Sequence, residues 1–207
     1  MGRPAGPRRR HLDRTSTIYS GLFPAAAFDA ECYNALTLTM AFRAPWASAG
    51  RLKVVNRAAL WVMAVDRLVN HTATTREQVD RLVRECLSVA DGAVPRSAAT
   101  RFLADLRDEL ATVREFGELR RVWRGQLARM LAGLARAWAW RDTDVVPTLE
   151  RCLDNADSRG SCFVDVSHWI YAATAGPGRA WRSCGTSARW SSVTCTCLGT
   201  SPPTART

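Results

Sequence analysis

The sequence predicts an all-α protein, and three features of the chain support this fold class. Apolar residues recur at intervals of three and four along most of residues 28–172, the spacing that gathers side chains on one face of a helix. Residue types that begin and end helices separate these periodic stretches. No stretch before the C-terminal tail alternates apolar and polar residues as a strand does. We therefore expect a bundle of at least five helices without a sheet.

The first two predicted helices cover residues 28–43 and 49–71. Asp29 lies in the first turn of the former, where a carboxylate interacts favourably with the helix dipole, and Pro45 follows its end. Ser48 can cap the second helix, whose middle is apolar around nearly its whole circumference. A helix of that kind is enclosed by other elements, so we expect it at the centre of the bundle.

Two further helices follow after short polar connections. Thr75 and Gln78 form the pattern of a capping box at the start of the third helix, and Gly92 follows its end. Ser97 can cap the fourth helix, in which apolar residues again recur at helical spacing. Both helices therefore have a sequence signal at their start as well as an apolar face.

The last predicted helices carry the longest apolar stripe of the chain and its clearest interruption. A fifth helix is predicted over residues 115–140. Pro147 suits the first turn of a sixth, which covers residues 145–173. Polar residues and a glycine interrupt it near 158–160, so it forms either one broken helix or two separate ones.

The net charge of +10 is concentrated at the two ends of the chain. Residues 1–14 hold five arginines and one acid, and residues 174–207 hold four arginines and no acid, which leaves 20 basic and 18 acidic residues in 15–173. A nucleic-acid-binding domain places its basic side chains on a folded face to neutralise phosphates. We therefore expect no nucleic-acid partner, and we interpret both ends as solvated basic tails.

We predict three regions and a cytoplasmic location. Residues 1–17 read as a disordered basic segment, 18–173 as a helical domain, and 174–207 as a disordered tail without a helical pattern. The seven cysteines are an odd number, and no apolar leader follows the N-terminal arginines, which favours a reduced cytoplasm. No apolar run approaches the roughly 20 residues that a membrane span needs.

Asp66 is the first candidate for a functional residue. Val55, Ala59, Val62, Asp66 and Asn70 share one face of the second helix, which is apolar until it presents a carboxylate and an amide one turn apart. The C-terminal end of a helix is unfavourable for a carboxylate, and a cation would relieve that cost. Oxygen ligands of this kind suit Mg²⁺. The alternative is that the carboxylate pairs with a neighbouring arginine.

The interruption in the last predicted helix is the second candidate. It holds two acids, an amide, a hydroxyl and a glycine, among them Asn155, Asp157, Ser158 and Gly160. A helix break that frees backbone groups inside a core is often functional. The alternative is a surface turn that joins two helices.

The helix that carries Asp66 resembles the Asp-rich helix of bacterial class I terpene cyclases, over residues 56–61 and 64–70. In that family the first aspartate and a carboxylate four residues later bind Mg²⁺ and the substrate diphosphate. Asp66 fits the first position, whereas Asn70 stands where the second acid is expected. The resemblance covers roughly residues 18–172.

The interruption resembles the helix break with which these enzymes sense diphosphate and trigger its departure. By this resemblance Asp157 is the linker acid and Gly160 the effector, Asn155 and Ser158 contact the substrate, and no clear sensor arginine is present. Aromatic faces stabilise the resulting carbocation in the family. The residues expected to line such a pocket, or else to serve as ordinary core, are Trp61, Phe102, Trp123, Phe163 and Trp169.

The resemblance implies a helical bundle of the class I terpenoid synthase type that is incomplete at its C-terminus. The family's second metal motif, an Asn/Asp–x3–Ser/Thr–x3–acid pattern, is absent. Codons for residues 198–207, read in a shifted frame, permit a threonine and an acid at the spacing of this motif, which fits an out-of-frame tail.

The resemblance also implies an activity, namely Mg²⁺-dependent ionisation and cyclisation of geranyl, farnesyl or geranylgeranyl diphosphate by a lyase. We expect this form of the chain to be inactive. A homodimer is one possible oligomeric state. The alternative function is that of a non-catalytic helical interaction protein or a degenerate pseudoenzyme.

Overall fold

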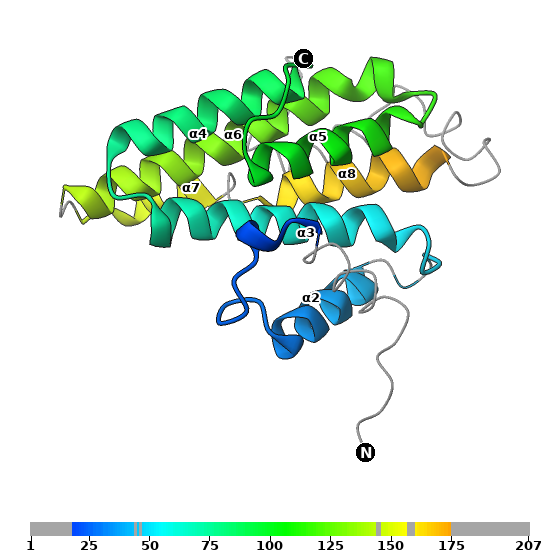
Figure 1. Ribbon diagram of the computed structural model, residues 1–207, viewed down its shortest axis with the longest axis horizontal. Helices are drawn as coiled ribbons and strands as arrows, with labels where there is room; N and C mark the ends of the chain where they lie inside the picture. The colour runs from blue at the N-terminus through cyan, green and yellow to red at the C-terminus, as the bar shows by residue number, and fades with distance from the viewer. Residues whose placement is uncertain (1–17, 44, 46, 144–145, 157–159, 175–207) are drawn as a thin grey trace, which may run out of the picture.

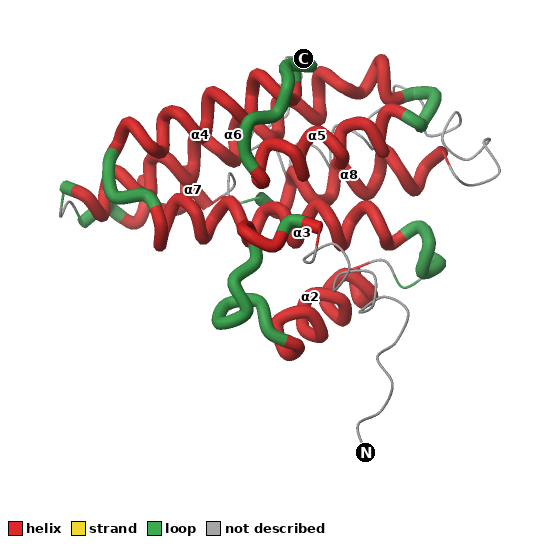
Figure 2. Tube along the Cα trace, in the orientation of Figure 1, coloured by secondary structure: helices red, strands yellow, loops and turns green. Residues whose placement is uncertain are grey.

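The computed structural model describes residues 18–43, 45, 47–143, 146–156 and 160–174 (Figure 1). Within these residues the regular secondary structure is entirely helical (Figure 2), which confirms the all-α class. The predictions for the two tails, and for Asp157 and Ser158, lie outside the described residues. The elements, in chain order, are η1 (Ser20–Leu22), α2 (Ala30–Arg43), α3 (Leu52–Arg67), η2 (Leu68–Thr72), α4 (Arg76–Ala90), α5 (Ala98–Ala111), α6 (Phe116–Asp142), α7 (Leu149–Ala156) and α8 (Ser161–Thr174).

Helix α3 lies at the centre of the bundle, as its nearly continuous apolar surface predicts. It packs against α2, α5 and α8, while α4 packs against α5 and α6. In Figure 1, α2 lies on the side of α3 that faces away from α4 and α6. Leu60, Trp61 and Val65 of α3 have no exposed surface, because neighbouring helices cover the helix from several sides.

The helix predicted over about 49–71 begins later than expected, and its last turn is π-helical. The α-helix begins at Leu52, and Ser48 instead heads the preceding turn, where its hydroxyl accepts a hydrogen bond from the amide of Arg51 at 3.4 Å. After Arg67 the chain continues as one π-helical turn, η2, in which the amide of Ala73 donates to the carbonyl of Leu68 at 2.8 Å. Such a turn places one more residue in the ring than an α-helix does.

The capping signals predicted for α4 and α5 are present in the structure. The backbone amide of Gln78 donates to the Thr75 hydroxyl, and the side-chain oxygen of Gln78 accepts from the backbone amide of Thr75. This confirms the predicted capping box at α4. Ser97 caps α5, with Thr100 in the reciprocal role. Gly92 follows α4 with a φ of 110°, a conformation that favours glycine. Local hydrogen bonds thus fix where these helices begin and end.

The C-terminal end of α4 is bound by three arginines from the two following helices. Arg107 of α5 donates to the carbonyl of Val89, and Arg120 of α6 donates to the carbonyl of Ala90 at 2.9 Å. Arg124 binds the Asp91 carboxylate through two hydrogen bonds of 3.1 and 3.0 Å. These contacts bring side-chain donors to the end of α4, where few helical amides remain for the last carbonyls.

Helix α6 is the longest element, at 27 residues, but charged side chains recur along it. Among the described residues no helix combines the length and the apolar character needed to cross a lipid bilayer.

Candidate functional site

Asp66 and Asn70 lie at the junction of α3 and η2, and their side chains bind each other. The Asn70 Nδ2 donates to the Asp66 Oδ1 at 2.9 Å, and both residues are half-buried. Among the described residues, no arginine or lysine forms an ion pair with Asp66. The alternative of pairing with a neighbouring arginine is therefore not what satisfies this carboxylate in the described part of the chain.

Arg141, near the C-terminal end of α6, fixes the other side of Asn70. Its guanidinium donates to the Asn70 carbonyl at 2.6 Å, to the Asn70 Oδ1 at 3.4 Å and to the Val69 carbonyl at 3.4 Å. Turning the amide over would place its oxygen against Asp66 and its NH2 against the guanidinium, and both contacts would be repulsive. The amide therefore presents its nitrogen, not its oxygen, to Asp66.

Asn155 connects α7 to α6 instead of facing an open site. It is 1% exposed, accepts a hydrogen bond from the Arg136 Nε at 3.0 Å and donates to the Gly133 carbonyl at 3.1 Å. Its amide oxygen and nitrogen both have partners, so each end of the amide is bound within the protein.

Gly160 brings the helix break against α3. It has a φ of +93°, and a Cβ built on it would lie 2.6 Å from the Cγ1 of Val62 and 3.3 Å from the Sδ of Met130. Val62 lies one helical turn before Asp66 on the same face of α3. The structure thus places the C-terminal side of the break next to the helix face that carries Asp66.

The aromatic residues expected to line a pocket occupy three different environments. The rings of Trp61 and Trp123 each lie 5.5 Å from that of Phe163, and all three side chains are buried. Their indole groups are satisfied, because Trp61 donates to the Ala99 carbonyl at 2.9 Å and Trp123 to the Ser167 hydroxyl at 3.0 Å.

The other two aromatic residues lie apart from this cluster. Phe102 stacks on Tyr19 at 4.6 Å, and Trp169 is 40% exposed. The structure therefore brings together three of the five expected lining residues, as one packed cluster.

The described residues around Asp66 supply few oxygen ligands for a metal ion. Across the described residues, no group of three or more His, Cys, Asp or Glu side chains is placed to hold a metal ion. At the α3–η2 junction the donor set is one carboxylate and an amide whose oxygen faces Arg141. Magnesium is usually held by one or two carboxylates, with waters and substrate phosphates completing its octahedral shell, so Asp66 is the carboxylate that this junction offers, while Arg141 binds the Asn70 oxygen.

Two further features were not found from the sequence. The Tyr19 hydroxyl donates to Asp105, and burial followed by this hydrogen bond raises the pKa of Tyr19 to about 12. An open cavity of about 400 Å³ lies where η1, η2, α4 and α5 meet, with Leu22, Leu68 and Arg81 in its wall. Each feature joins residues far apart in the chain, so no local pattern indicates it.

Comparison with known proteins adds no family assignment. No family model matches the chain, and no curated protein matches it.

Proposed function

We propose that the chain carries one wall of a class I terpene cyclase site for a linear prenyl diphosphate, and that the 207-residue chain does not convert such a substrate by itself. Geranyl, farnesyl and geranylgeranyl diphosphate are the candidate substrates. The observation that carries the proposal is the contact of Gly160 with Val62, one turn before Asp66.

This contact supports the proposal because Gly160 and Val62 lie 98 positions apart in the sequence yet are neighbours in the bundle, and Val62 is one turn from Asp66. The break leads into α8, which packs against α3, so it is not a turn between two surface helices. Here a glycine with positive φ lies between Val62 and Met130, on the helix face that carries the acidic residue. A diphosphate-sensing break and a diphosphate-facing acid require this kind of adjacency.

The absence of turnover follows from the available charge. Departure of diphosphate requires concentrated positive charge, which carboxylate ligands gather in the form of metal ions. Asp66 and Asn70 together carry one formal negative charge, and the sequence has no aspartate or glutamate after Asp165. Residues 166–207 therefore supply no carboxylate side chain for a second set of metal ligands.

The turnover part is tested with the purified chain. We expect no cyclic hydrocarbon after incubation with Mg²⁺ and each of the three diphosphates, relative to boiled protein. Metal-dependent cyclic product would contradict this part of the proposal.

The variant Asn70→Asp tests whether the Asp66 face is a metal site that has lost its second acid, because it places a carboxylate one turn from Asp66. We expect Mg²⁺ to raise the melting temperature of this variant, since tenfold excess over the dissociation constant stabilises a protein by about 1.4 kcal/mol. His71→Asp is the matched control, because His71 is exposed and adjacent to Asn70, and its side chain leaves the helix in a different direction. It should show no specific response to Mg²⁺.

The second candidate is a non-catalytic helical protein. It is favoured because Asp66, Asn70 and Asn155 all form hydrogen bonds within the protein. In that case the polar residues serve only to join helices. If Mg²⁺ fails to stabilise Asn70→Asp more than His71→Asp, this second candidate replaces the first.

A further inference from the structure

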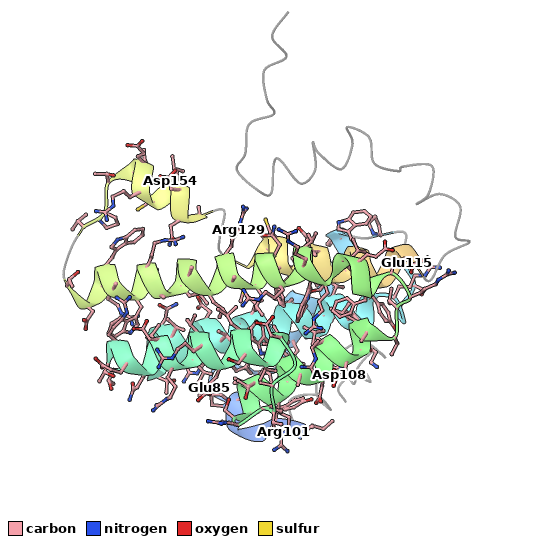
Figure 3. All side chains as sticks on the ribbon, turned by 90° about the horizontal axis from the view of Figure 1, so that it is seen from above. Glu85, Arg101, Asp108, Glu115, Arg129 and Asp154 are labelled. Atoms are coloured by element: carbon pink, nitrogen blue, oxygen red, sulfur yellow. The ribbon has the colours of Figure 1, made fainter. Side chains whose placement is uncertain are left out.

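Helix α7 packs against α6 through its polar side. Asn155 binds Arg136 and Gly133 of α6, and the guanidinium of Arg151 lies 5.8 Å from the ring centre of Trp140. In Figure 3, α7 lies along the outer side of α6, away from the layers that form the core. Hydrogen bonds and one cation–π contact therefore attach this helix to the bundle.

The apolar residues of α7 face the solvent instead. Leu149 and Leu153 are 75% and 59% exposed, and their spacing of four residues places them on one side of α7. Val146, in the segment that precedes α7, is 91% exposed. We call Leu149 and Leu153 the α7 stripe. A surface helix normally buries its apolar face against the core, so this orientation leaves a contact surface without a partner in the described residues.

Acidic side chains flank the α7 stripe. Glu150 and Asp154 are exposed, lie one turn apart, and form no ion pair with another described residue. Like charges at this spacing repel each other, and a cationic partner would relieve the repulsion. The surface thus combines an apolar stripe with a negative border.

We propose that the α7 stripe is a docking surface for a basic amphipathic helix of another polypeptide. Residues at this spacing match the side chains of a helix laid alongside, with leucine-type anchors packing between Leu149 and Leu153. Arginines or lysines beside the anchors would pair with Glu150 and Asp154. This inference is independent of the proposed cyclase site.

The same acids exclude two other occupants. A second copy docked through its own α7 stripe would bring Glu150 and Asp154 against their counterparts, a like-charge contact that costs affinity. An anionic membrane surface would repel them, because basic residues are what such surfaces attract.

The test measures binding of labelled peptides to the full 207-residue chain by fluorescence anisotropy. The probe is a leucine-striped helical peptide of about 18 residues, five turns, with arginine at the flanking positions. One control peptide carries glutamate at those positions, and another has the composition of the probe in shuffled order. We expect the basic striped peptide to bind, and both controls to bind at least about tenfold more weakly.

Paired variants locate the binding surface. Leu149→Ser with Leu153→Ser should weaken binding about tenfold or more, since two apolar contacts are lost. Glu150→Gln with Asp154→Asn should weaken it severalfold at low salt and remove most of the salt dependence. The matched control is Leu38→Ser with Phe42→Ser on α2, an exposed apolar pair at the same spacing, which should leave binding unchanged.

Several results would overturn the proposal. If the shuffled peptide bound as well as the probe, the interaction would depend on charge alone. If the acidic peptide bound as well, it would depend on apolar contact alone. Equal weakening by the α2 pair would mean that the surface is not α7. Binding of the chain to phosphatidylcholine vesicles, lost with the Leu149 and Leu153 substitutions, would assign the α7 stripe to a lipid surface. Far-UV circular dichroism verifies that each variant is folded.

Discussion

Gly160, in the break between α7 and α8, is in contact with Val62 of α3. A Cβ at position 160 would lie 2.6 Å from the Val62 Cγ1. Gly160 also has a φ of +93°, which L-amino acids with side chains rarely adopt. The conformation of the break and its closeness to α3 therefore both depend on this glycine.

Gly160→Ala should destabilise the protein by about 2 kcal/mol or more. The left-handed conformation costs about 1–2 kcal/mol for a residue with a side chain, and the contact with Val62 adds overpacking of roughly 1–3 kcal/mol. Urea unfolding measures the change. Gly125→Ala, within α6 and with no atom within 4 Å of the position that its methyl group would take, should instead stabilise the protein by roughly 0.5–1 kcal/mol. Equal stability of the two variants would show that Gly160 is not constrained.

Arg141→Ala should destabilise the π-helical turn η2, because the guanidinium binds the carbonyls of Val69 and Asn70. We expect a loss of about 1 kcal/mol, the usual size of such hydrogen bonds at a partly exposed site. Faster amide exchange at residues 69–73 would locate the effect. Arg121→Ala, an exposed position on the same helix, should change neither quantity. Unchanged exchange in Arg141→Ala would contradict this role.

Tyr19 should make the protein lose stability between pH 10 and 12. Its pKa is raised from 10.0 to about 12, first by burial and then by the bond to Asp105. Above pH 10 the unfolded chain releases this proton while the folded chain keeps it, so the stabilising contribution present below pH 10 is lost as pH rises.

Urea unfolding at a series of alkaline pH values tests this, and Tyr19→Phe should flatten the fall. In Asp105→Asn the pKa of Tyr19 should move down yet stay above its ordinary value, because burial remains. Absorbance of tyrosinate at 295 nm reports that shift directly. A Tyr19→Phe protein with the same alkaline slope as the parent would refute the assignment.

Cys86 and Cys152 should differ sharply in reactivity. Burial, followed by the nearby Glu85 charge, raises the pKa of Cys86 to about 12, whereas Cys152 is exposed. Since the thiolate is the reactive form, an aromatic disulfide reagent at pH 8 should modify Cys152 rapidly and Cys86 only on unfolding. Cys152→Ser should remove one rapidly reacting thiol, and Cys86→Ser none. A smaller rapid phase in Cys86→Ser would mean that Cys86 is accessible.

The sequence predicts those parts of the fold that local interactions determine. Thr75 and Gln78 lie three residues apart, so their capping box is visible in the sequence and present in the structure. The π-helical turn was missed, because Arg141 and Trp138 of α6 supply its partners from about 70 positions away. The exposure of Leu149 and Leu153 on α7 likewise depends on how that helix packs and was not predicted.

The candidate site was predictable to a smaller extent. A helical stripe indicates which face of α3 carries Asp66, yet it does not reveal that Asn70 offers its nitrogen to that carboxylate. Asn155 looks like a free polar group within a helix break, whereas Arg136 and Gly133 of another helix take up its amide. Such partners depend on tertiary packing, which one sequence does not encode locally.

The arginines at the end of α4 have a consequence for the order in which the protein opens. Arg107, Arg120 and Arg124 tie the last turn of α4 to α5 and α6, while the first turn is closed by its own capping box. Both ends of α4 are thus protected from fraying, which is where helices usually begin to unwind. The slowest-exchanging amides should therefore include those of α4, and α4 with its two neighbours should open as one cooperative unit.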